Sequence, residues 1–332
     1  MWLALGLGLF AAVIVWAGPA ETLGALVQSR RHPGLLAGAV GLFAATQAVF
    51  LLKWHWMSRL VGAGATMRQS LRLFGTLMLV GTFTPGRAGE LVVPLLMRGG
   101  GRLTGVALIN RLLESTGTLC AGLLALALVL SDDPRSARIW NIGPVLALFV
   151  AILLVLSRRR YTAAVLAMVR RILSPLARFG PVARLLAAEE RCAAGLDQFY
   201  DANERLVRPG PIFVFALLLA LIWGLMVSGN YLIIQATAAQ GAKEVTFLVV
   251  MAVVAASAVA MFVSPIPGGL GLSEFTVVAL LGQLGYESEA FVPFLLLMRI
   301  VFYAVVILLY VIGRLAGEDL AAQAPAAASP ES

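Results

Sequence analysis

Three arginines and three glutamates interrupt stretches of this 332-residue sequence that are otherwise apolar enough to cross a lipid bilayer. They are Arg87, Glu90, Arg111, Glu114, Glu274 and Arg299. A charged side chain at the centre of a bilayer costs at least about 2.5–3.5 kcal/mol, so these residues are expected to face the protein interior or a wet cavity. There they can bind a charged group, carry a proton or pair with one another.

The first break in an apolar segment is the run Thr84-Pro85-Gly86-Arg87-Ala88-Gly89-Glu90. Pro85 suits the first turn of a helix, while Gly86 and Gly89 permit a sharp turn and a close approach by another group. A helix that begins inside the membrane presents free N–H groups and the positive end of its dipole, which suit an anion such as phosphate. Arg87 adds a fixed positive charge, and Glu90 lies one helical turn later, where it can pair with Arg87.

A second break, Pro265-Ile266-Pro267-Gly268-Gly269-Leu270-Gly271-Leu272-Ser273-Glu274, repeats these features in the other half of the chain. Its turn residues are Pro267, Gly268, Gly269 and Gly271. Glu274 opens the outgoing helix, and Arg299 in the last apolar segment is its expected partner. A matched pair of interrupted apolar segments is the best sequence indication of a transporter binding site.

Asn110, Arg111 and Glu114 follow the first break at spacings that place them on one face of a helix, and this face is expected to point inward. Two interpretations stay open. The pairs Arg87–Glu90, Arg111–Glu114 and Arg299–Glu274 either fix the packing of helices and nothing more, or they line a polar central cavity that binds a charged lipid headgroup or a coupling ion. The recurrence of charges, broken helices and glycine turns in both halves favours the cavity.

The composition excludes an ordinary soluble domain. Hydrophobic residues make up 60% of the chain and charged residues 13%, against about 25% charged residues in soluble proteins. Basic residues beside membrane spans report orientation and contact with anionic lipid, so the net charge of +8 does not indicate nucleic acid. The two cysteines and two histidines have no metal-ligand spacing, and we expect no metal, no cofactor and no catalytic residue.

Apolar segments recur from end to end and predict an all-α, polytopic bundle of about six full spans plus two interrupted, re-entrant helical hairpins. The segments are 1–18, 34–52, 73–97 (interrupted), 104–130, 141–156, 211–238, 246–285 (interrupted) and 291–313. We expect a single transmembrane domain over 1–317, with repeat A at about 1–156, a cytoplasmic amphipathic linker at 157–210 and repeat B at about 211–317. Residues 318–332, rich in Ala, Pro and Ser, are expected to form a disordered tail.

Lysine and arginine place the 157–210 linker and the C-terminus in the cytoplasm. A basic loop before the first break stays cytoplasmic only if 73–97 is a re-entrant hairpin with its tip near Pro85-Gly86. The basic residues of that loop are Lys53, Arg59, Arg68 and Arg72. The segment 246–285 is then a second hairpin from the opposite side, or two tilted spans. The two halves would have opposite orientations, as in an inverted repeat.

These motifs taken together resemble the lysylphosphatidylglycerol synthase transmembrane-region family, also called flippase-like membrane proteins. The resemblance rests on the two breaks, on Asn110-Arg111 with Glu114, and on Glu274, and it covers roughly residues 1–317. It implies a multi-pass protein of the bacterial inner membrane that moves or handles polar lipids. In the multiple peptide resistance factor, a related membrane region flips aminoacylated phosphatidylglycerol and is fused to a soluble aminoacyl-transferase domain. This chain ends shortly after its last apolar segment, so we expect no transferase and no lipid aminoacylation.

The first functional hypothesis is a transporter for an anionic or glycosylated lipid. Its substrate-binding residues would be Arg87, Glu90, Asn110, Arg111, Glu114, Gly268, Gly269, Glu274 and Arg299. Its hinge and turn residues would be Pro85, Gly86, Gly89, Pro267 and Gly271. The alternatives are a non-transporting scaffold of a lipid-biosynthesis complex, with hopanoid, polyprenyl-phosphate sugar or aminoacyl-lipid enzymes as partners, and a membrane-embedded lipid-modifying enzyme.

Overall fold

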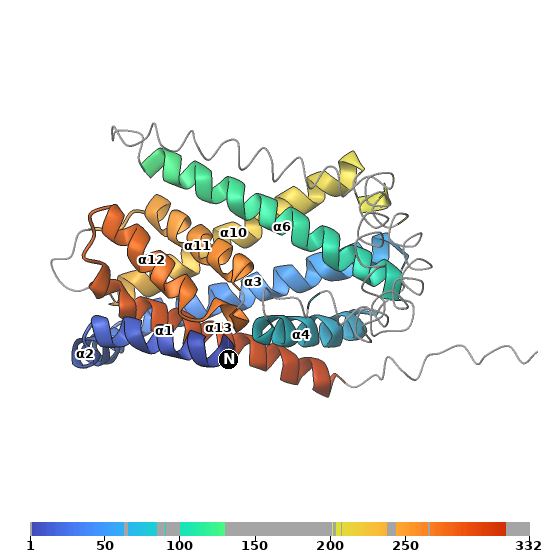
Figure 1. The fold of residues 1–332 in the computed structure, drawn as a ribbon. Coiled ribbons are helices and arrows are strands. Elements are labelled where there is room, and N and C mark those ends of the chain that lie inside the picture. The colour runs from blue at the N-terminus through green and yellow to red at the C-terminus, as the bar shows by residue number, and fades with distance from the viewer. Residues whose placement is uncertain are drawn as a thin grey trace, which may run out of the picture.

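The fold consists of long helices packed side by side (Figure 1). The computed structural model describes residues 2–62, 66–84, 90, 100–129, 201, 204–206, 208–237, 244–264 and 266–316. Every regular element in these residues is an α-helix or a short 3-10 helix, which confirms the all-α prediction for this part of the chain.

Four of the described helices are long and apolar enough to cross a membrane. They are α3 (Pro33–Leu60), α6 (Gly100–Val129), α10 (Pro209–Thr237) and α13 (Val292–Leu315). They coincide with four of the six predicted full spans, so the chain is a multi-spanning membrane protein. A fifth predicted span, 141–156, lies outside the described residues.

The predicted span at 1–18 is not confirmed. Helix α1 (Trp2–Trp16) has 15 residues, about 22 Å of helix, whereas the hydrocarbon core is about 30 Å thick. Gly18 adopts a positive φ of 80° and Pro19 begins a second helix, α2 (Pro19–Ser29), so the chain turns before a full span is complete. The hydrophobic content of 1–18 was correctly identified, but the glycine–proline turn limits its length.

A short helix ends at each predicted break. Helix α4 (Met67–Phe83) ends just before the first break, and α11 (Phe247–Val263) ends just before the second. Both have 17 residues, about 25 Å of helix. A single 3-10 turn, η4 (Pro267–Gly269), then leads into α12 (Leu272–Gln283), which contacts α11. A second 3-10 turn, η5 (Ser288–Phe291), joins α12 to α13.

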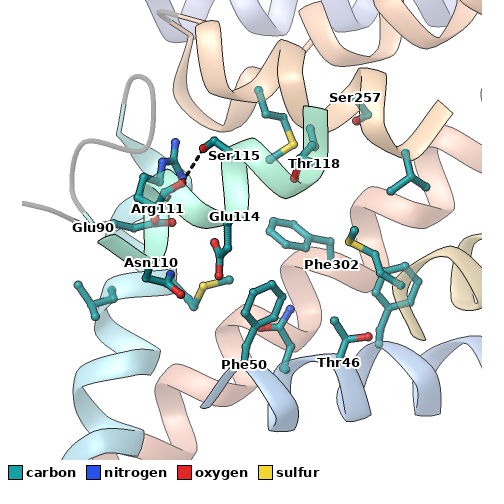
Figure 2. A pocket seen from close by; sticks show the side chains of 18 of the residues that line it. Thr46, Phe50, Glu90, Asn110, Arg111, Glu114, Ser115, Thr118, Ser257 and Phe302 are labelled. Atoms are coloured by element: carbon teal, nitrogen blue, oxygen red, sulfur yellow. Dashed lines mark hydrogen bonds and ion pairs between the residues drawn. The ribbon is translucent and has the colours of Figure 1, made fainter. Parts of the chain in front are cut away.

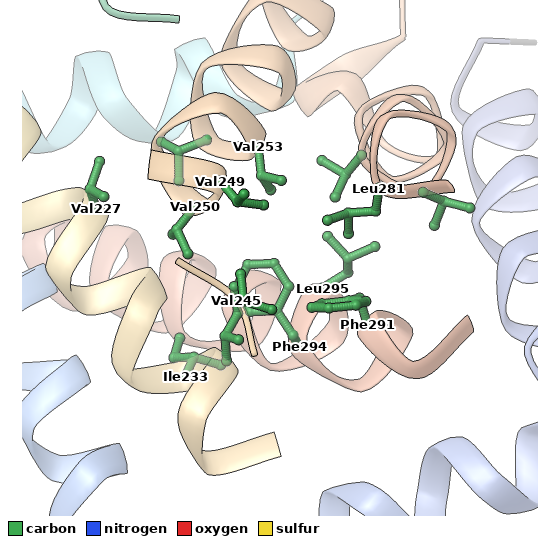
Figure 3. Packing of buried hydrophobic residues seen from close by; sticks show 14 of the residues in the cluster. Val227, Ile233, Val245, Val249, Val250, Val253, Leu281, Phe291, Phe294 and Leu295 are labelled. Carbon is green, nitrogen blue, oxygen red and sulfur yellow. The ribbon is translucent and has the colours of Figure 1, made fainter. Parts of the chain in front are cut away.

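Packing between distant parts of the sequence holds the bundle together. Helix α3 lies along α10, α4 lies along α13, and α6 lies along α11. A large apolar cluster joins α10, α11, α12 and α13 (Figure 3). Its labelled members are Val227, Ile233, Val245, Val249, Val250, Val253, Leu281, Phe291, Phe294 and Leu295. In a bilayer such contacts stabilise the bundle through close packing, because lipid tails are as apolar as the side chains.

Two glycines allow α4 and α13 to approach closely. A Cβ atom added to Gly75 would lie 2.9 Å from the backbone oxygen of Leu309, and one added to Gly313 would lie 3.0 Å from Cα of Arg72. Backbone atoms cannot move aside as a flexible side chain can. The α4–α13 contact therefore depends on the absence of side chains at these two positions.

We predict that Gly75→Ala lowers the stability of the folded protein by about 1–3 kcal/mol, because the new methyl group overpacks the α4–α13 contact. The matched control is Gly41→Ala in α3, where an added Cβ would meet nothing within 4 Å. The measurement is the thermal unfolding midpoint of the purified protein in detergent. Equal midpoints for the two variants would contradict the proposed role of Gly75.

Candidate functional site

The second break lies against the end of α4, the helix that leads to the first break. A Cβ added to Gly268 in the second break would lie 3.1 Å from the backbone oxygen of Thr82, near the end of α4. Phe83, the last residue of α4, stacks on Tyr303 of α13 with ring centroids 6.3 Å apart. Gly268 has a φ of 62°, a conformation that suits glycine, so it supplies both the turn and the close approach.

Arg299 holds the second break in place. Its guanidinium pairs with the Glu274 carboxylate, and it donates hydrogen bonds to the Ser273 hydroxyl and, at 3.0 Å, to the backbone oxygen of Gly268. Glu274 in turn accepts a 2.7 Å hydrogen bond from the Gly271 backbone N–H. Arg299 is 3% exposed and Glu274 1%. The expected Arg299–Glu274 pair is therefore present, and it fixes the turn that contains Pro267, Gly268, Gly269 and Gly271.

Arg111 reaches back to the first break. Its Nη1 lies 3.1 Å from Oε2 of Glu90, which is 21 positions earlier in the chain. The expected Arg111–Glu114 pair is therefore wrong. Both residues face the same side of α6, but a long arginine side chain can bridge between elements, and Glu90 supplies a carboxylate there. The other expected pair, Arg87–Glu90, cannot be judged, because Pro85, Gly86, Arg87 and Gly89 lie outside the described residues.

Glu114 pairs instead with Lys53 of α3. The lysine is 1% exposed, and its Nζ lies 4.7 Å from the ring centroid of Phe50 and 4.8 Å from that of Phe215. The expected loop position of Lys53 is wrong, because α3 continues to Leu60 and contains this residue. The sequence contained one indication of a special role for Lys53. Lysine accounts for two of the 25 basic residues, and Lys53 directly follows an apolar segment.

These groups surround one central cavity of about 430 Å³. Six helices contribute to its wall: α3, α4, α6, α10, α11 and α13. Five of the predicted binding residues line it: Glu90, Asn110, Arg111, Glu114 and Arg299. Figure 2 shows Glu90 and Arg111 at one side of this space, with Asn110 and Glu114 beside them, and Phe50 and Phe302 facing its middle.

The predicted residues of the second break do not form the wall themselves. Gly268, Gly269 and Glu274 are buried, and Gly268 and Glu274 contact Arg299, which does line the cavity. Their contribution to binding therefore acts through the position of Arg299. Direct contact between these three residues and a substrate stays a prediction.

The wall combines balanced charge with a largely apolar surface. Two carboxylates, Glu90 and Glu114, and two arginines, Arg111 and Arg299, line the cavity. Glu90 pairs with Arg111, while Glu114 and Arg299 pair with Lys53 and Glu274, which lie outside the wall. Phenylalanine, leucine, methionine and valine side chains cover most of the remaining wall. A small inorganic ion would leave that apolar surface unmatched, whereas an amphipathic molecule has a polar group for the charges and an apolar part for the rest.

The family model described as lysylphosphatidylglycerol synthase TM region matches residues 2–309 of the chain, nearly its whole length. No curated protein and no solved structure matches it. The matched range includes both breaks, the helices α3, α6 and α10, α13 as far as residue 309, and every residue of the three ion pairs.

We predict that Glu114→Gln destabilises the fold by about 3–5 kcal/mol, because it leaves the buried Lys53 ammonium without its counter-charge. Lys53→Met should cost less, since Glu114 faces the cavity and can be hydrated there. The double variant should recover most of the loss. The measurement is a double-mutant cycle on unfolding in mixed detergent micelles, and simple additivity of the two single effects would contradict a direct Lys53–Glu114 interaction.

Proposed function

The chain belongs to the lysylphosphatidylglycerol synthase transmembrane-region family, and on that premise we propose that it moves a lipid with an anionic or glycosylated headgroup across the bacterial inner membrane. The headgroup passes through the central cavity while the acyl tails stay in the bilayer. The chain acts as a transporter and not as an enzyme, and its partners are membrane lipids. The observation that carries the proposal is the cavity, which combines Arg111 and Glu114 with an apolar wall.

The order and packing of the helices support an inverted repeat. In the first half α3 and α4 precede the first break and α6 follows it, and in the second half α10 and α11 precede the second break and α13 follows it. In an inverted repeat α3, α4 and α6 would correspond to α10, α11 and α13. The contact between α4 and α13 then corresponds to the contact between α11 and α6, and the contact between α3 and α10 corresponds to itself. The Arg111–Glu90 ion pair of the first half likewise corresponds to the Arg299–Glu274 ion pair of the second half. The cavity then lies at the repeat interface, where secondary transporters bind substrate.

The short helices at the breaks support re-entrant hairpins. At about 25 Å, α4 and α11 fall short of a hydrocarbon core of about 30 Å. The adjacent positions of Thr82 and Gly268 bring the second break against the end of α4 inside the protein. Backbone without regular hydrogen bonding is tolerated at membrane depth only in such a protein-lined place. Transport would follow from rocking one half against the other around this contact.

The six charged residues have different roles in this proposal. Arg111 neutralises the lipid phosphate, and Glu90 orients Arg111 through their hydrogen bond. Arg299 maintains the second break through three donated hydrogen bonds and shapes the opposite wall. Glu114 faces the cavity, and it pairs with Lys53, which is buried behind the wall.

A non-transporting scaffold is the second candidate. It is favoured by the three ion pairs at the cavity, since ion pairs also fix helix packing. A lipid-biosynthesis enzyme that copurifies in fixed stoichiometry, together with vesicles that show no lipid movement, would support the scaffold.

We predict that Arg111→Gln slows translocation of an anionic lipid at least about tenfold, because the lipid phosphate loses its counter-charge in a water-poor cavity. The measurement uses purified protein in vesicles and an anionic phospholipid labelled on its acyl chain, with dithionite quenching of the label in the outer leaflet. Arg111→Lys, which keeps the charge, should retain part of the rate.

The matched control is Arg59→Gln, which removes an exposed arginine from the last turn of α3. It should move lipid at the wild-type rate. If Arg111→Gln is folded by size-exclusion chromatography and also moves lipid at the wild-type rate, Arg111 does not bind the headgroup. A new lipid product in vesicles that contain this protein alone would support the enzyme alternative.

A further inference from the structure

Two buried amides line the cavity where α3 packs against α10. Gln47 of α3 is 5% exposed and Asn230 of α10 is 2% exposed, and both contribute to the cavity wall. Within the residues that the structure describes, Oε1 of Gln47 and Oδ1 of Asn230 have no hydrogen-bond partner. Buried acceptors are almost always satisfied in folded proteins, so these two indicate a group that arrives from the cavity.

The orientation of the Asn230 amide follows from its other contact. Its Nδ2 donates a 2.8 Å hydrogen bond to the backbone oxygen of Met226. A backbone carbonyl only accepts, so the nitrogen must face Met226 and the oxygen must remain available. Asn230 therefore offers the cavity an acceptor and not a donor.

Other polar groups of the wall strengthen this excess of acceptors. The hydroxyl of Thr46 donates to the backbone oxygen of Leu42 at 2.8 Å, and that of Ser115 donates to the backbone oxygen of Arg111 at 2.7 Å. Each oxygen then keeps only its accepting capacity for the cavity. Oδ1 of Asn110 also lacks a partner among the described residues. A ligand that satisfies these oxygens must bring hydrogen-bond donors. Trp54 adds one donor to the wall, since its Nε1 also lacks a partner among the described residues, and a hydroxyl group can both donate to the oxygens and accept from this N–H.

The donors that fit best are uncharged. The amide and hydroxyl oxygens carry no net charge, and the carboxylates of Glu90 and Glu114 already pair with Arg111 and Lys53. An ammonium group placed beside Gln47 and Asn230 would lose its hydration, and no carboxylate would be available there to pair with its charge. Hydroxyl groups lose less on leaving water and match neutral acceptors.

We propose that Gln47 and Asn230 form a subsite for the hydroxyl groups of a polyol headgroup, such as a glycerol or a sugar. This inference rests on the proposed lipid transport and specifies its substrate class. The phosphate of the lipid lies toward Arg111, and the hydroxyls beyond it donate to the two amides, with Asn110 as a further acceptor. The protein therefore distinguishes one anionic lipid from another by the hydroxyl groups of the headgroup and not by its charge.

The test compares two labelled lipids with the same phosphodiester charge. Phosphatidylglycerol carries two headgroup hydroxyls, and phosphatidylmethanol carries none. In vesicles that contain the full chain, phosphatidylglycerol should move roughly tenfold faster, a factor that one or two net hydrogen bonds supply. Labelled phosphatidylethanolamine, whose donor is an ammonium, should move no faster than phosphatidylmethanol.

Substitutions of the two amides should remove the preference. Asn230→Leu and Gln47→Met keep the approximate side-chain size without the acceptor, and each should slow phosphatidylglycerol more than phosphatidylmethanol, so that the ratio of the two rates falls toward one. The matched control is Gln28→Met at an exposed position of α2. Since each lipid is its own reference within one variant, a partly unfolded preparation slows both lipids and does not mimic the effect.

Two results would overturn the inference separately from the proposed function. Equal movement of phosphatidylglycerol and phosphatidylmethanol by the wild-type protein would refute the polyol subsite and leave lipid transport intact. Faster movement of phosphatidylethanolamine would assign the acceptors to an ammonium. If no labelled lipid moves, the proposed transport fails and the subsite fails with it.

Discussion

An apolar helix can break inside a membrane only if the protein itself satisfies the freed backbone groups and any charges, and in this chain the Arg299 guanidinium meets much of that requirement for the second break. It bridges the Glu274 carboxylate, the Ser273 hydroxyl and the Gly268 backbone oxygen, while Glu274 accepts from the Gly271 N–H. The turn is thereby fixed against the end of α4, where Gly268 approaches Thr82. The position of the cavity follows from this contact, because it holds the two broken segments together.

The same requirement explains why the charges come in pairs. Each cation of the described site has a carboxylate partner on another part of the chain, so assembly of the helices also assembles the charged groups. Buried pairs of this kind contribute little net stability, because desolvation offsets their attraction. Their value lies in fixing which helices meet. A headgroup phosphate that enters can then share an arginine already held in place, as the Arg111–Glu90 pair allows.

Much of this arrangement was predictable from residue type and spacing. Proline, glycine and glutamate in two apolar segments predicted the breaks, and a lone arginine in the last segment predicted the Arg299–Glu274 pair. The partner of Arg111 was not predictable, because the spacing of residues along one helix does not show which carboxylate another element brings close to it. Lys53 was missed for a related reason: its burial depends on Glu114 and on the rings of Phe50 and Phe215, which only the tertiary fold brings together. The amide of Gln47 lies in an ordinary apolar helix, and its significance emerged only from the cavity.

The measurement that tests the account most directly is native mass spectrometry of the lipids retained by the purified protein, compared with a variant whose cavity is filled. Ser257 is small, buried and part of the cavity wall, so Ser257→Trp should occupy the space of a headgroup. The account predicts that the wild-type protein retains an anionic lipid with a hydroxylated headgroup and that the folded Ser257→Trp variant loses it. Retention of the same lipid in equal amount by both proteins would contradict a headgroup site in the central cavity.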